Sequence, residues 1–303
     1  MGAIRGVPHP FPYQGSKRKL AGQIIACIPS GIERLVEPFA GSAAITLAAA
    51  YRRRANHFLI NDIHEPLIDL WNAIIHHPHR LIALYQSLWN EQSGRERVFY
   101  DEIRDEFNRT HCPHCFLYLL ARCVKAAVRY NGKGQFNNSP DNRRKGMHPD
   151  TMERNIIRTS ELLNGRTEVS CRDYEEVLDE TTCDDVVYMD PPYQGVCGGR
   201  DQRYCQSIEF GQFAESLRRL NERDVPFIVS YDGRTGSKVY GRDLPDELGL
   251  IRTEILVGRS TQATLLGRDH HTFESLYLSP SIMERLGSIP KVLRENHQKL
   301  LFA

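Results

Sequence analysis

Short apolar runs alternate with longer segments of helical period in the first part of the chain. Runs at 35–39 and 58–61 predict buried strands, and the segments from 41 to 54 and from 67 to 74 predict helices. Strands that alternate with helices predict an α/β fold with a mostly parallel sheet, whose ligands bind at the carboxyl ends of the strands. Later apolar runs continue this pattern at 168–171, 185–189 and 227–230, and a terminal hairpin is expected from 251–257 and 273–278.

Residues 88–160 interrupt this alternation and are more polar. Their apolar positions keep a helical period from 116 to 130, and Arg122, Lys125 and Arg129 are expected on another face of the same helix. The predicted organisation is a discontinuous catalytic domain at 1–87 and 161–280, an inserted and mainly helical domain at 88–160, and a helical tail at 281–303.

Composition limits the class of protein. Hydrophobic residues make up 41% and charged residues 25%, as is usual for a globular protein. No apolar run approaches the about 18 residues that span a membrane, and the N-terminus lacks a secretory pattern. The eight cysteines are scattered, which favours reduced thiols over a disulfide framework. We therefore expect a cytoplasmic protein without a membrane partner.

The segment from His111 to Cys115 contains a C-x-x-C spacing that also occurs in zinc sites. A structural zinc ion needs four ligands, and the other close cysteine pair, Cys197 and Cys205, lies in a distant segment. We expect no metal and a pair of packed thiols at Cys112 and Cys115, with a zinc site as the alternative.

Two segments that follow predicted strands carry candidate chemistry. In the first, Glu37-Pro38-Phe39-Ala40-Gly41-Ser42, a strand enters a glycine turn that opens a helix, so backbone N–H groups face any ligand there. Gly41 has no Cβ and lets a ligand approach the backbone. Asp62 follows the next strand, where a carboxylate can accept hydrogen bonds from ribose hydroxyls. The pair indicates a cofactor with a nucleoside, although a tight turn alone would also explain the glycine.

The second segment is Asp190-Pro191-Pro192-Tyr193. Successive prolines end the strand and supply no N–H donors, so the turn presents carbonyl oxygens. Asp190 and the Pro191 carbonyl can each accept one hydrogen of an amino group, and Tyr193 can stack on the planar ring that bears it. A base within a duplex could not reach such a pocket, so the base must be flipped out.

These contacts also address the chemical difficulty of alkylating an aromatic amine. The lone pair of such an amine is delocalised into the ring, and two acceptors favour a pyramidal nitrogen. The carboxylate then stabilises positive charge that develops in the transition state. In-line positioning against a sulfonium methyl group is sufficient, and no covalent enzyme intermediate is required.

These motifs and their order resemble the Dam-like, class-alpha family of adenine-specific DNA methyltransferases, over about residues 11 to 280. The resemblance implies a Rossmann-like methyltransferase sheet with an inserted DNA-recognition domain. It also implies S-adenosyl-L-methionine as the cofactor and the 6-amino group of a flipped-out adenine in duplex DNA as the methyl acceptor.

The resemblance assigns roles to individual residues. The catalytic residues are Asp190, Pro191 and Tyr193. In the segment from Tyr13 to Lys17, Tyr13 contacts the cofactor and Lys17 lies near its carboxylate, while Asp62 accepts hydrogen bonds from the ribose. Asp173 matches a position that lines the adenine pocket. The complete expected cofactor-binding set is Tyr13, Lys17, Glu37, Phe39, Gly41, Asp62, Asp173 and Asp190.

Charge is concentrated locally, because the net charge of the chain is only +1. From 122 to 145 there are seven basic residues and one acid, which favours either a phosphate-contacting surface or a solvated helix face. Residues 129–131 and 134–137 are also similar to the family's DNA-contacting segment. The expected DNA-binding residues are Arg122, Lys125, Arg129, Asn131, Lys133, Gln135, Asn137, Arg143, Arg144 and Lys145. Double-stranded DNA is the expected partner, and a cognate restriction endonuclease in the same cell is a second candidate.

Three alternatives stay open. An enzyme acting on the 4-amino group of cytosine would use the same amine chemistry, although that class more often has serine at the position of Asp190. RNA is an alternative substrate. A catalytically silent DNA-binding regulator on the same scaffold would be expected to have lost some of the motif residues.

Overall fold

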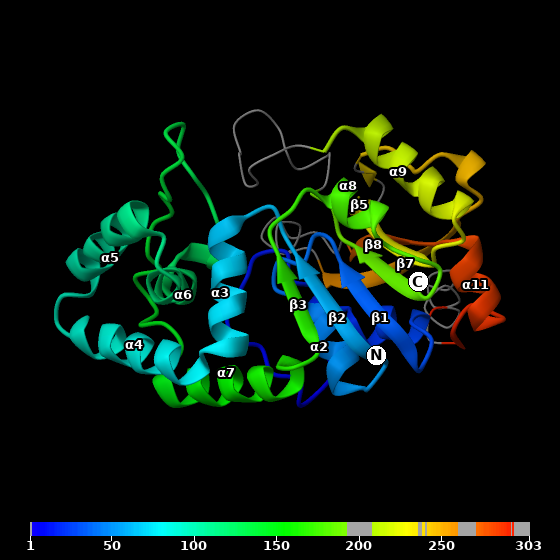
Figure 1. Cartoon of the computed structure of the whole chain (residues 1–303). Helices are drawn as coiled ribbons and strands as arrows, with labels where there is room; N and C mark the ends of the chain where they lie inside the picture. The colour runs from blue at the N-terminus through cyan, green and yellow to red at the C-terminus, as the bar shows by residue number, and fades with distance from the viewer. Residues whose placement is uncertain are drawn as a thin grey trace.

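An eight-stranded sheet forms the centre of the protein (Figure 1). The computed structural model describes residues 2–192, 208–235, 238–239, 241–259, 271–291 and 293. Within them the strand order is β3 (Thr167–Ser170), β2 (Ala55–Asn61), β1 (Ile32–Glu37), β4 (Asp185–Met189), β5 (Phe227–Thr235), β8 (His271–Leu278) and β7 (Ile251–Arg259), and β6 (Lys238–Val239) pairs with β5.

The strand directions confirm the predicted α/β fold. Strands β3, β2, β1, β4 and β5 are parallel to one another. Strand β8 pairs antiparallel with both β5 and β7, so the expected antiparallel pairing of the two terminal apolar runs is also confirmed. The carboxyl ends of the parallel strands therefore meet at one edge of the sheet.

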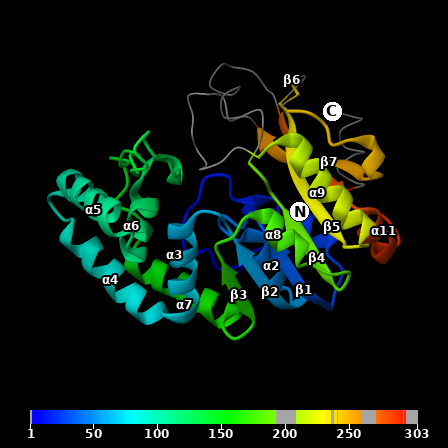
Figure 2. The same cartoon turned by 45° about the horizontal axis from the view of Figure 1, so that its top comes forward.

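Helices cover both faces of the sheet, so the central strand β4 is buried on both sides. All five of its residues are buried, which is typical of a parallel strand between two helical layers. Val187 and Met189 pack in the core under α8 (Tyr174–Asp179) and α9 (Phe210–Glu222), which lie over the sheet in Figure 2. Val186 and Tyr188 join the core on the opposite face, which contains α1 (Ala21–Ile24) and α2 (Ala44–Tyr51).

The remaining long helices gather beyond β3, to one side of the sheet (Figures 1 and 2). They are α3 (Glu65–His76), α4 (Pro78–Glu91), α5 (Glu96–Thr110), α6 (Pro113–Arg122) and α7 (Pro149–Leu163). We call residues 78–163 the helical unit. No helix in the described part of the chain is long and apolar enough to cross a membrane.

Short helical turns complete the described structure. They are η1 (Lys17–Lys19), η2 (Ile25–Cys27), η3 (Val124–Ala126), η4 (Asp246–Leu248) and the terminal helix α11 (Pro280–Leu286). Helix α11 occupies the beginning of the predicted helical tail, and residues 294–303 lie outside the described residues. The division into domains stays a prediction. Helix α4 runs across the predicted boundary at 87/88, and α7 runs across the predicted boundary at 160/161.

The predicted helix from 116 to 130 is wrong beyond Arg122. Helix α6 ends there, and Lys125 has a left-handed φ of 60°. The amide of Asn138 donates hydrogen bonds to the carbonyls of Val124 (3.1 Å) and Ala127 (2.9 Å). These long-range bonds hold the chain in a non-helical path, and sequence periodicity carries no information about them.

Asn61, at the end of β2, joins the loops that follow three strands. Its side chain is fully buried, and Nδ2 donates to the carbonyls of Pro38 (3.0 Å) and Arg172 (3.0 Å). Its Oδ1 accepts hydrogen bonds from the Ser170 hydroxyl (2.6 Å) and the Arg172 amide (3.0 Å). The four bonds use the full hydrogen-bonding capacity of the amide. Asn61 therefore fixes the relative positions of the segments after β1, β2 and β3.

We predict that Asn61→Ala lowers the free energy of unfolding by about 3 kcal/mol, because buried partners lose their hydrogen bonds at about 1–3 kcal/mol each. Denaturant unfolding measures the change. Asn56→Ala is the matched control on the same strand, since Asn56 is exposed and its side chain bonds Glu33. Equal losses in the two variants would show that Asn61 does not hold the strand ends together.

Candidate active site

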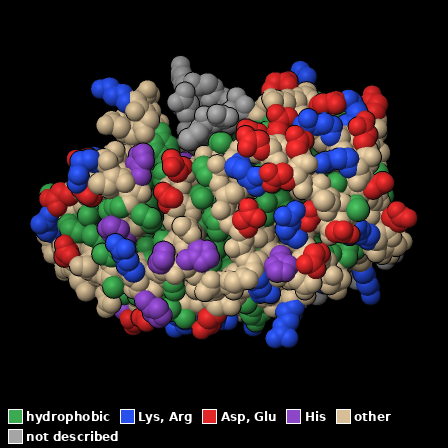
Figure 3. All heavy atoms as spheres, in the orientation of Figure 1, with side chains coloured by type: hydrophobic (Ala, Val, Ile, Leu, Met, Phe, Trp, Pro, Cys, Tyr) green, Lys and Arg blue, Asp and Glu red, His purple; other side chains and the backbone are tan. Residues whose placement is uncertain are grey.

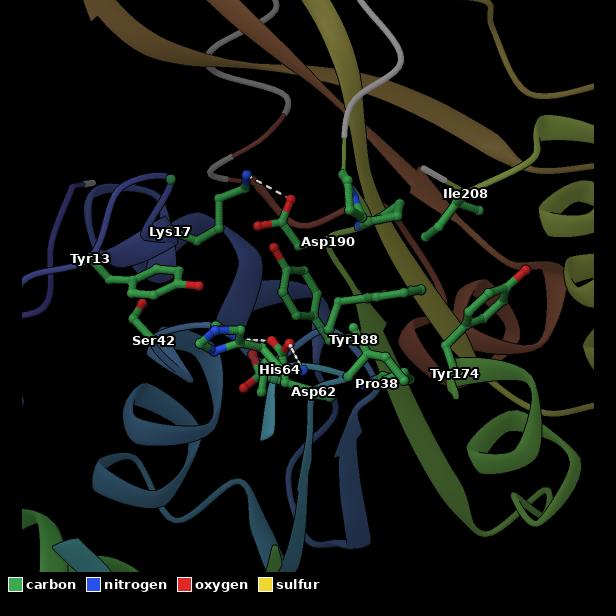
Figure 4. Close-up of a pocket in the computed structure, with 18 of the residues that line it drawn as sticks. Tyr13, Lys17, Pro38, Ser42, Asp62, His64, Tyr174, Tyr188, Asp190 and Ile208 are labelled. Atoms are coloured by element: carbon green, nitrogen blue, oxygen red, sulfur yellow. Dashed lines mark hydrogen bonds and ion pairs between the residues drawn. The ribbon is translucent and has the colours of Figure 1, made fainter. Parts of the chain in front are cut away.

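A cavity of about 510 Å³ lies at the carboxyl ends of the parallel strands (Figure 4). Its lining includes Pro191 and every residue of the expected cofactor-binding set: Tyr13, Lys17, Glu37, Phe39, Gly41, Asp62, Asp173 and Asp190. Tyr193 lies outside the described residues. Residues more than 170 positions apart in the chain thus reach one cavity.

The glycine turn after β1 is held from three sides. The Gly41 amide donates to Oδ2 of Asp62 (2.9 Å), and its carbonyl accepts from Nε1 of Trp71 (2.9 Å). Gly41 has a φ of +49°, and an added Cβ would lie 3.3 Å from the Tyr13 ring. Both the backbone conformation and the close aromatic ring therefore favour glycine here.

Asp62 supports the glycine turn and keeps hydrogen-bond acceptor sites for a ligand. Besides the Gly41 amide, the carboxylate accepts a hydrogen bond from the His64 amide at Oδ1 (3.1 Å). Burial raises the pKa of Asp62, and these two backbone hydrogen bonds oppose the rise. A carboxylate has about four lone-pair sites, so two acceptor positions are left for a ligand in the cavity.

Glu37, the acid of the first motif, is deeply buried, with 2% of its surface exposed. Burial raises its pKa to about 8, against the lowering effect of hydrogen bonds with the amides of Ile45 and Thr46 at the start of α2. Its Oε2 has no hydrogen-bond partner among the described residues. Because buried polar atoms normally have a partner, this oxygen on the cavity wall fits a donor group of a bound cofactor.

The segment from Tyr13 to Lys17 spans one side of the cavity. Its Gln14 amide donates to the Ala126 carbonyl in the helical unit (3.0 Å), and the Ser42 hydroxyl donates to the Ser16 hydroxyl (2.8 Å). These contacts attach the N-terminal segment to both the helical unit and the glycine turn.

Lys17 pairs with two carboxylates. Its Nζ lies 2.7 Å from Oδ1 of Asp190, as drawn in Figure 4, and 3.3 Å from Oε1 of Glu274 on β8. Burial acts to lower the pKa of Lys17, but the charges of the two acids outweigh it and raise the pKa above its ordinary value. Glu274 was not expected from the sequence. A charged residue within the apolar run 273–278 is the signal that could have identified it.

The sequence did not predict two further contacts at the cavity. The Tyr130 hydroxyl lies 2.6 Å from Nε2 of His64, which joins the helical unit to the segment after β2. On the opposite wall, the rings of Phe39 and Tyr174 pack with centroids 5.0 Å apart. Asp173 lies beside Tyr174 and caps α8, where it accepts a hydrogen bond from the Glu175 amide (2.9 Å).

The arrangement joins a nucleoside-type cofactor turn to the Asp190 motif within one cavity, and comparison with known proteins agrees with it. A profile of the D12 class N6 adenine-specific DNA methyltransferases matches residues 13–284. The chain belongs to this family. The prediction of an adenine-specific DNA methyltransferase on an α/β methyltransferase scaffold is thereby confirmed.

Individual relatives differ in how much of their length they share with this chain. The DNA N-6-adenine-methyltransferase of Escherichia phage P1 is 30% identical over 61% of this chain, and the match covers 24% of that protein. The retron Ec67 DNA adenine methylase of Escherichia coli is 32% identical over 72% of this chain and 75% of its own length. The type II methyltransferase M.MjaIII of Methanocaldococcus jannaschii is 29% identical over 72% of this chain and 82% of its own length.

In this D12 class member, residues 129–137 form a hairpin at the edge of the helical unit. The Asn131 amide donates to the Gln135 carbonyl (2.8 Å), and the Asn137 amide donates to the Arg129 carbonyl (3.0 Å). Lys133, Gln135 and Asn137 are exposed, and Arg129 and Asn131 are half-buried. Figure 3 shows basic side chains at the projecting tip of the helical unit, while both signs of charge are interspersed over the rest of that face.

The expected DNA-binding set needs one correction. Arg122 is only 3% exposed, and the methylenes of its side chain pack near Gly146. The helix turns this side chain inward, so Arg122 is removed from the expected contact surface.

Residues 143–145 are exposed but are engaged with acids. Arg143 and Arg144 lie 3.6 and 3.5 Å from carboxylate oxygens of Asp141, and Lys145 lies 3.3 Å from Glu96 at the start of α5. The expected basic segment is therefore two surfaces, the hairpin and this turn. Lys125 is exposed in the short helical turn η3, which precedes the hairpin.

The expectation of reduced thiols is wrong at one pair, because Cys112 and Cys115 form a disulfide. Their Cα atoms are 5.5 Å apart across the start of α6, a separation that suits a disulfide. His114 lies close enough to complete a group of three potential metal ligands. Thiols joined to each other are not available as thiolate ligands, so this group carries no metal assignment. Cys197 and Cys205 lie outside the described residues.

We predict a pH-dependent difference in stability between wild type and Glu37→Gln. Because burial raises the pKa of Glu37 to about 8, the protonated form is favoured in the folded state. Its stabilising contribution is complete below the ordinary glutamate pKa of about 4.3, and it is lost as pH rises through about 8. Glutamine does not titrate, so wild type should lose stability relative to the variant over this range. Parallel denaturant curves at successive pH values would contradict the assignment if their difference were constant.

Proposed function

We propose that this protein transfers the methyl group of S-adenosyl-L-methionine to the 6-amino group of an adenine flipped out of duplex DNA. The observation that carries the proposal is the shared cavity: the Asp190-Pro191 turn and the Gly41 turn both line it. A methyl donor and a methyl acceptor must meet within a few ångströms, and this geometry allows that meeting.

The cavity residues fit the chemical groups of this cofactor. Asp62 has two acceptor positions for ribose hydroxyls, and the unpartnered oxygen of Glu37 suits the cofactor's amino group. Gly41 and Tyr13 both line the cavity, where the Tyr13 ring packs against the Gly41 backbone and supplies an aromatic surface. When bound, the cofactor supplies an electrophilic methyl group on a positively charged sulfur.

Asp190 and Pro191 act on the base. The Asp190 carboxylate is fixed by Lys17 at Oδ1, and a carboxylate keeps acceptor capacity beyond one ion pair. It accepts one hydrogen of the adenine amine, and the Pro191 carbonyl accepts the other. Negative charge held beside the nitrogen stabilises the positive charge that develops during methyl transfer. Tyr193 is proposed to stack on the base.

The hairpin at 129–137 and Lys125 are proposed to contact the DNA, with the turn at 143–145 as an additional phosphate-binding surface. The hairpin is favoured because Tyr130 contacts His64 at the cavity, so a duplex held by Lys133 and its neighbours lies within reach of the base pocket. Arginine and lysine on such surfaces bind phosphates irrespective of sequence, and amide side chains can read bases.

Two wider aspects belong to the same proposal. The relative named as a type II methyltransferase supports a role in modification beside a cognate restriction endonuclease. The cytoplasm is the proposed location, because the substrate is cellular DNA. The family match favours adenine over the alternative of cytosine.

We predict that Asp190→Asn reduces single-turnover methyl transfer by about two orders of magnitude or more, because the charge that stabilises the transition state is lost. The measurement uses labelled S-adenosyl-L-methionine and unmethylated double-stranded genomic DNA. Asp243→Asn is the matched control, since Asp243 pairs with Arg252 at the exposed surface. Near-normal transfer by the Asp190 variant would exclude the proposed mechanism. Transfer by wild type to duplex RNA instead of DNA would favour the RNA alternative.

We predict that Asp62→Ala weakens cofactor binding by about tenfold to a hundredfold, the expected loss of hydrogen bonds to a charged group. Calorimetric titration with S-adenosyl-L-methionine measures the affinity, and DNA binding should change little. The exposed Asp69 on the following helix provides the control variant Asp69→Ala. An unchanged titration for Asp62→Ala would refute the ribose assignment.

A further inference from the structure

Glu274 occupies an unusual place for a carboxylate. It lies on β8, inside the sheet between β5 and β7, and only 10% of its side chain is exposed. Burial raises its pKa, and Lys17 only partly offsets this effect. A buried carboxylate is costly unless it is paired, so its position on a core strand requires a partner. That partner is Lys17.

The backbone around Glu274 is specialised. The pairing of β5 with β8 shifts register between Tyr231 and Arg234, and this bulge lies opposite Glu274. A Cβ at Gly233 would lie 2.0 Å from the Phe273 carbonyl oxygen and 2.7 Å from the Glu274 Cα, so only glycine fits there. Bulges beside active sites commonly redirect a side chain. The bulge and the tight glycine contact fix the backbone that carries Glu274.

The summed charge of Lys17, Asp190 and Glu274 explains why a second acid is useful. Lys17 with Asp190 alone would form a neutral pair, in which the ammonium offsets the negative charge that the reacting amine needs. Glu274 places another carboxylate 3.3 Å from the same ammonium, on the side of the sheet core. With both acids ionised, the three groups carry a net negative charge, and Lys17 is held between two partners rather than committed to Asp190.

We propose that Glu274 is a positioning residue for methyl transfer, which acts through Lys17 to orient Asp190 and to preserve its negative character. This inference rests on the proposed function of Asp190. The proposed role needs no contact between Glu274 and the substrate, because Lys17 bridges it to Asp190.

The test compares single-turnover methyl transfer in wild type, Glu274→Gln and Glu274→Asp, using unmethylated double-stranded genomic DNA and labelled S-adenosyl-L-methionine. Glutamine keeps the shape and an acceptor oxygen but removes the charge. We expect the Gln variant to react at least tenfold more slowly, while its affinities for cofactor and DNA change less than twofold. The Asp variant retains the charge and should react faster than the Gln variant. Glu254→Gln is the matched control, because Glu254 is an ion-paired acid on the adjacent strand β7.

A double-mutant cycle with Lys17→Met separates positioning from general stability. If Glu274 acts through Lys17, Glu274→Gln should have little further effect on the rate once Lys17 is replaced. Equal rates for wild type, Glu274→Gln and Glu274→Asp would overturn the proposal, as would fully additive losses in the cycle. Absence of transfer by wild type would instead refute the proposed function, so the two failures are distinguishable.

Discussion

The end of β2 places two polar side chains, Asn61 and Asp62, next to each other in the chain, and the shape of the site depends on their hydrogen bonds. Asn61 faces the protein interior and bonds backbone groups of the segments after β1 and β3. Asp62 bonds the amide of Gly41 and so sets the turn that opens α2. Without these bonds, the carboxyl edge of the sheet would be a set of independent loops.

The cavity and the adjoining strand β8 concentrate buried acids, which are stabilised in three different ways. Glu37 is favoured in its protonated form, as burial raises its pKa to about 8. Asp62 is held by backbone amides, and Asp190 and Glu274 share one ammonium. This distribution allows a neutral acid and anionic acids to lie close together at one end of the sheet.

The helical unit reaches the site through a small number of contacts. Phe136 is buried against Phe107 and Phe116, and the amide of Asn108 bonds the Phe136 backbone on both sides. This aromatic support holds the hairpin rigidly enough for Tyr130 to contact His64. The exposed hairpin and the cavity are thereby connected through a short path of packed side chains.

The sequence by itself determined the parallel sheet, the turn at Gly41, and the residues around Asp62 and Asp190 that line one cavity, because these features depend on local patterns. Strand burial, glycine conformation and the proline turn all leave signals within a few neighbouring residues.

Only the tertiary structure decided the features that depend on distant partners. The helix stops at Arg122, and Asn138 bonds the carbonyls that follow. The Arg122 side chain, which charge alone assigned to DNA, is buried. Glu274 lies more than 80 residues beyond Asp190, and both acids pair with Lys17, near the start of the chain. Such contacts are fixed by sheet register and by a bulge, whose long-range pairing no local sequence pattern specifies.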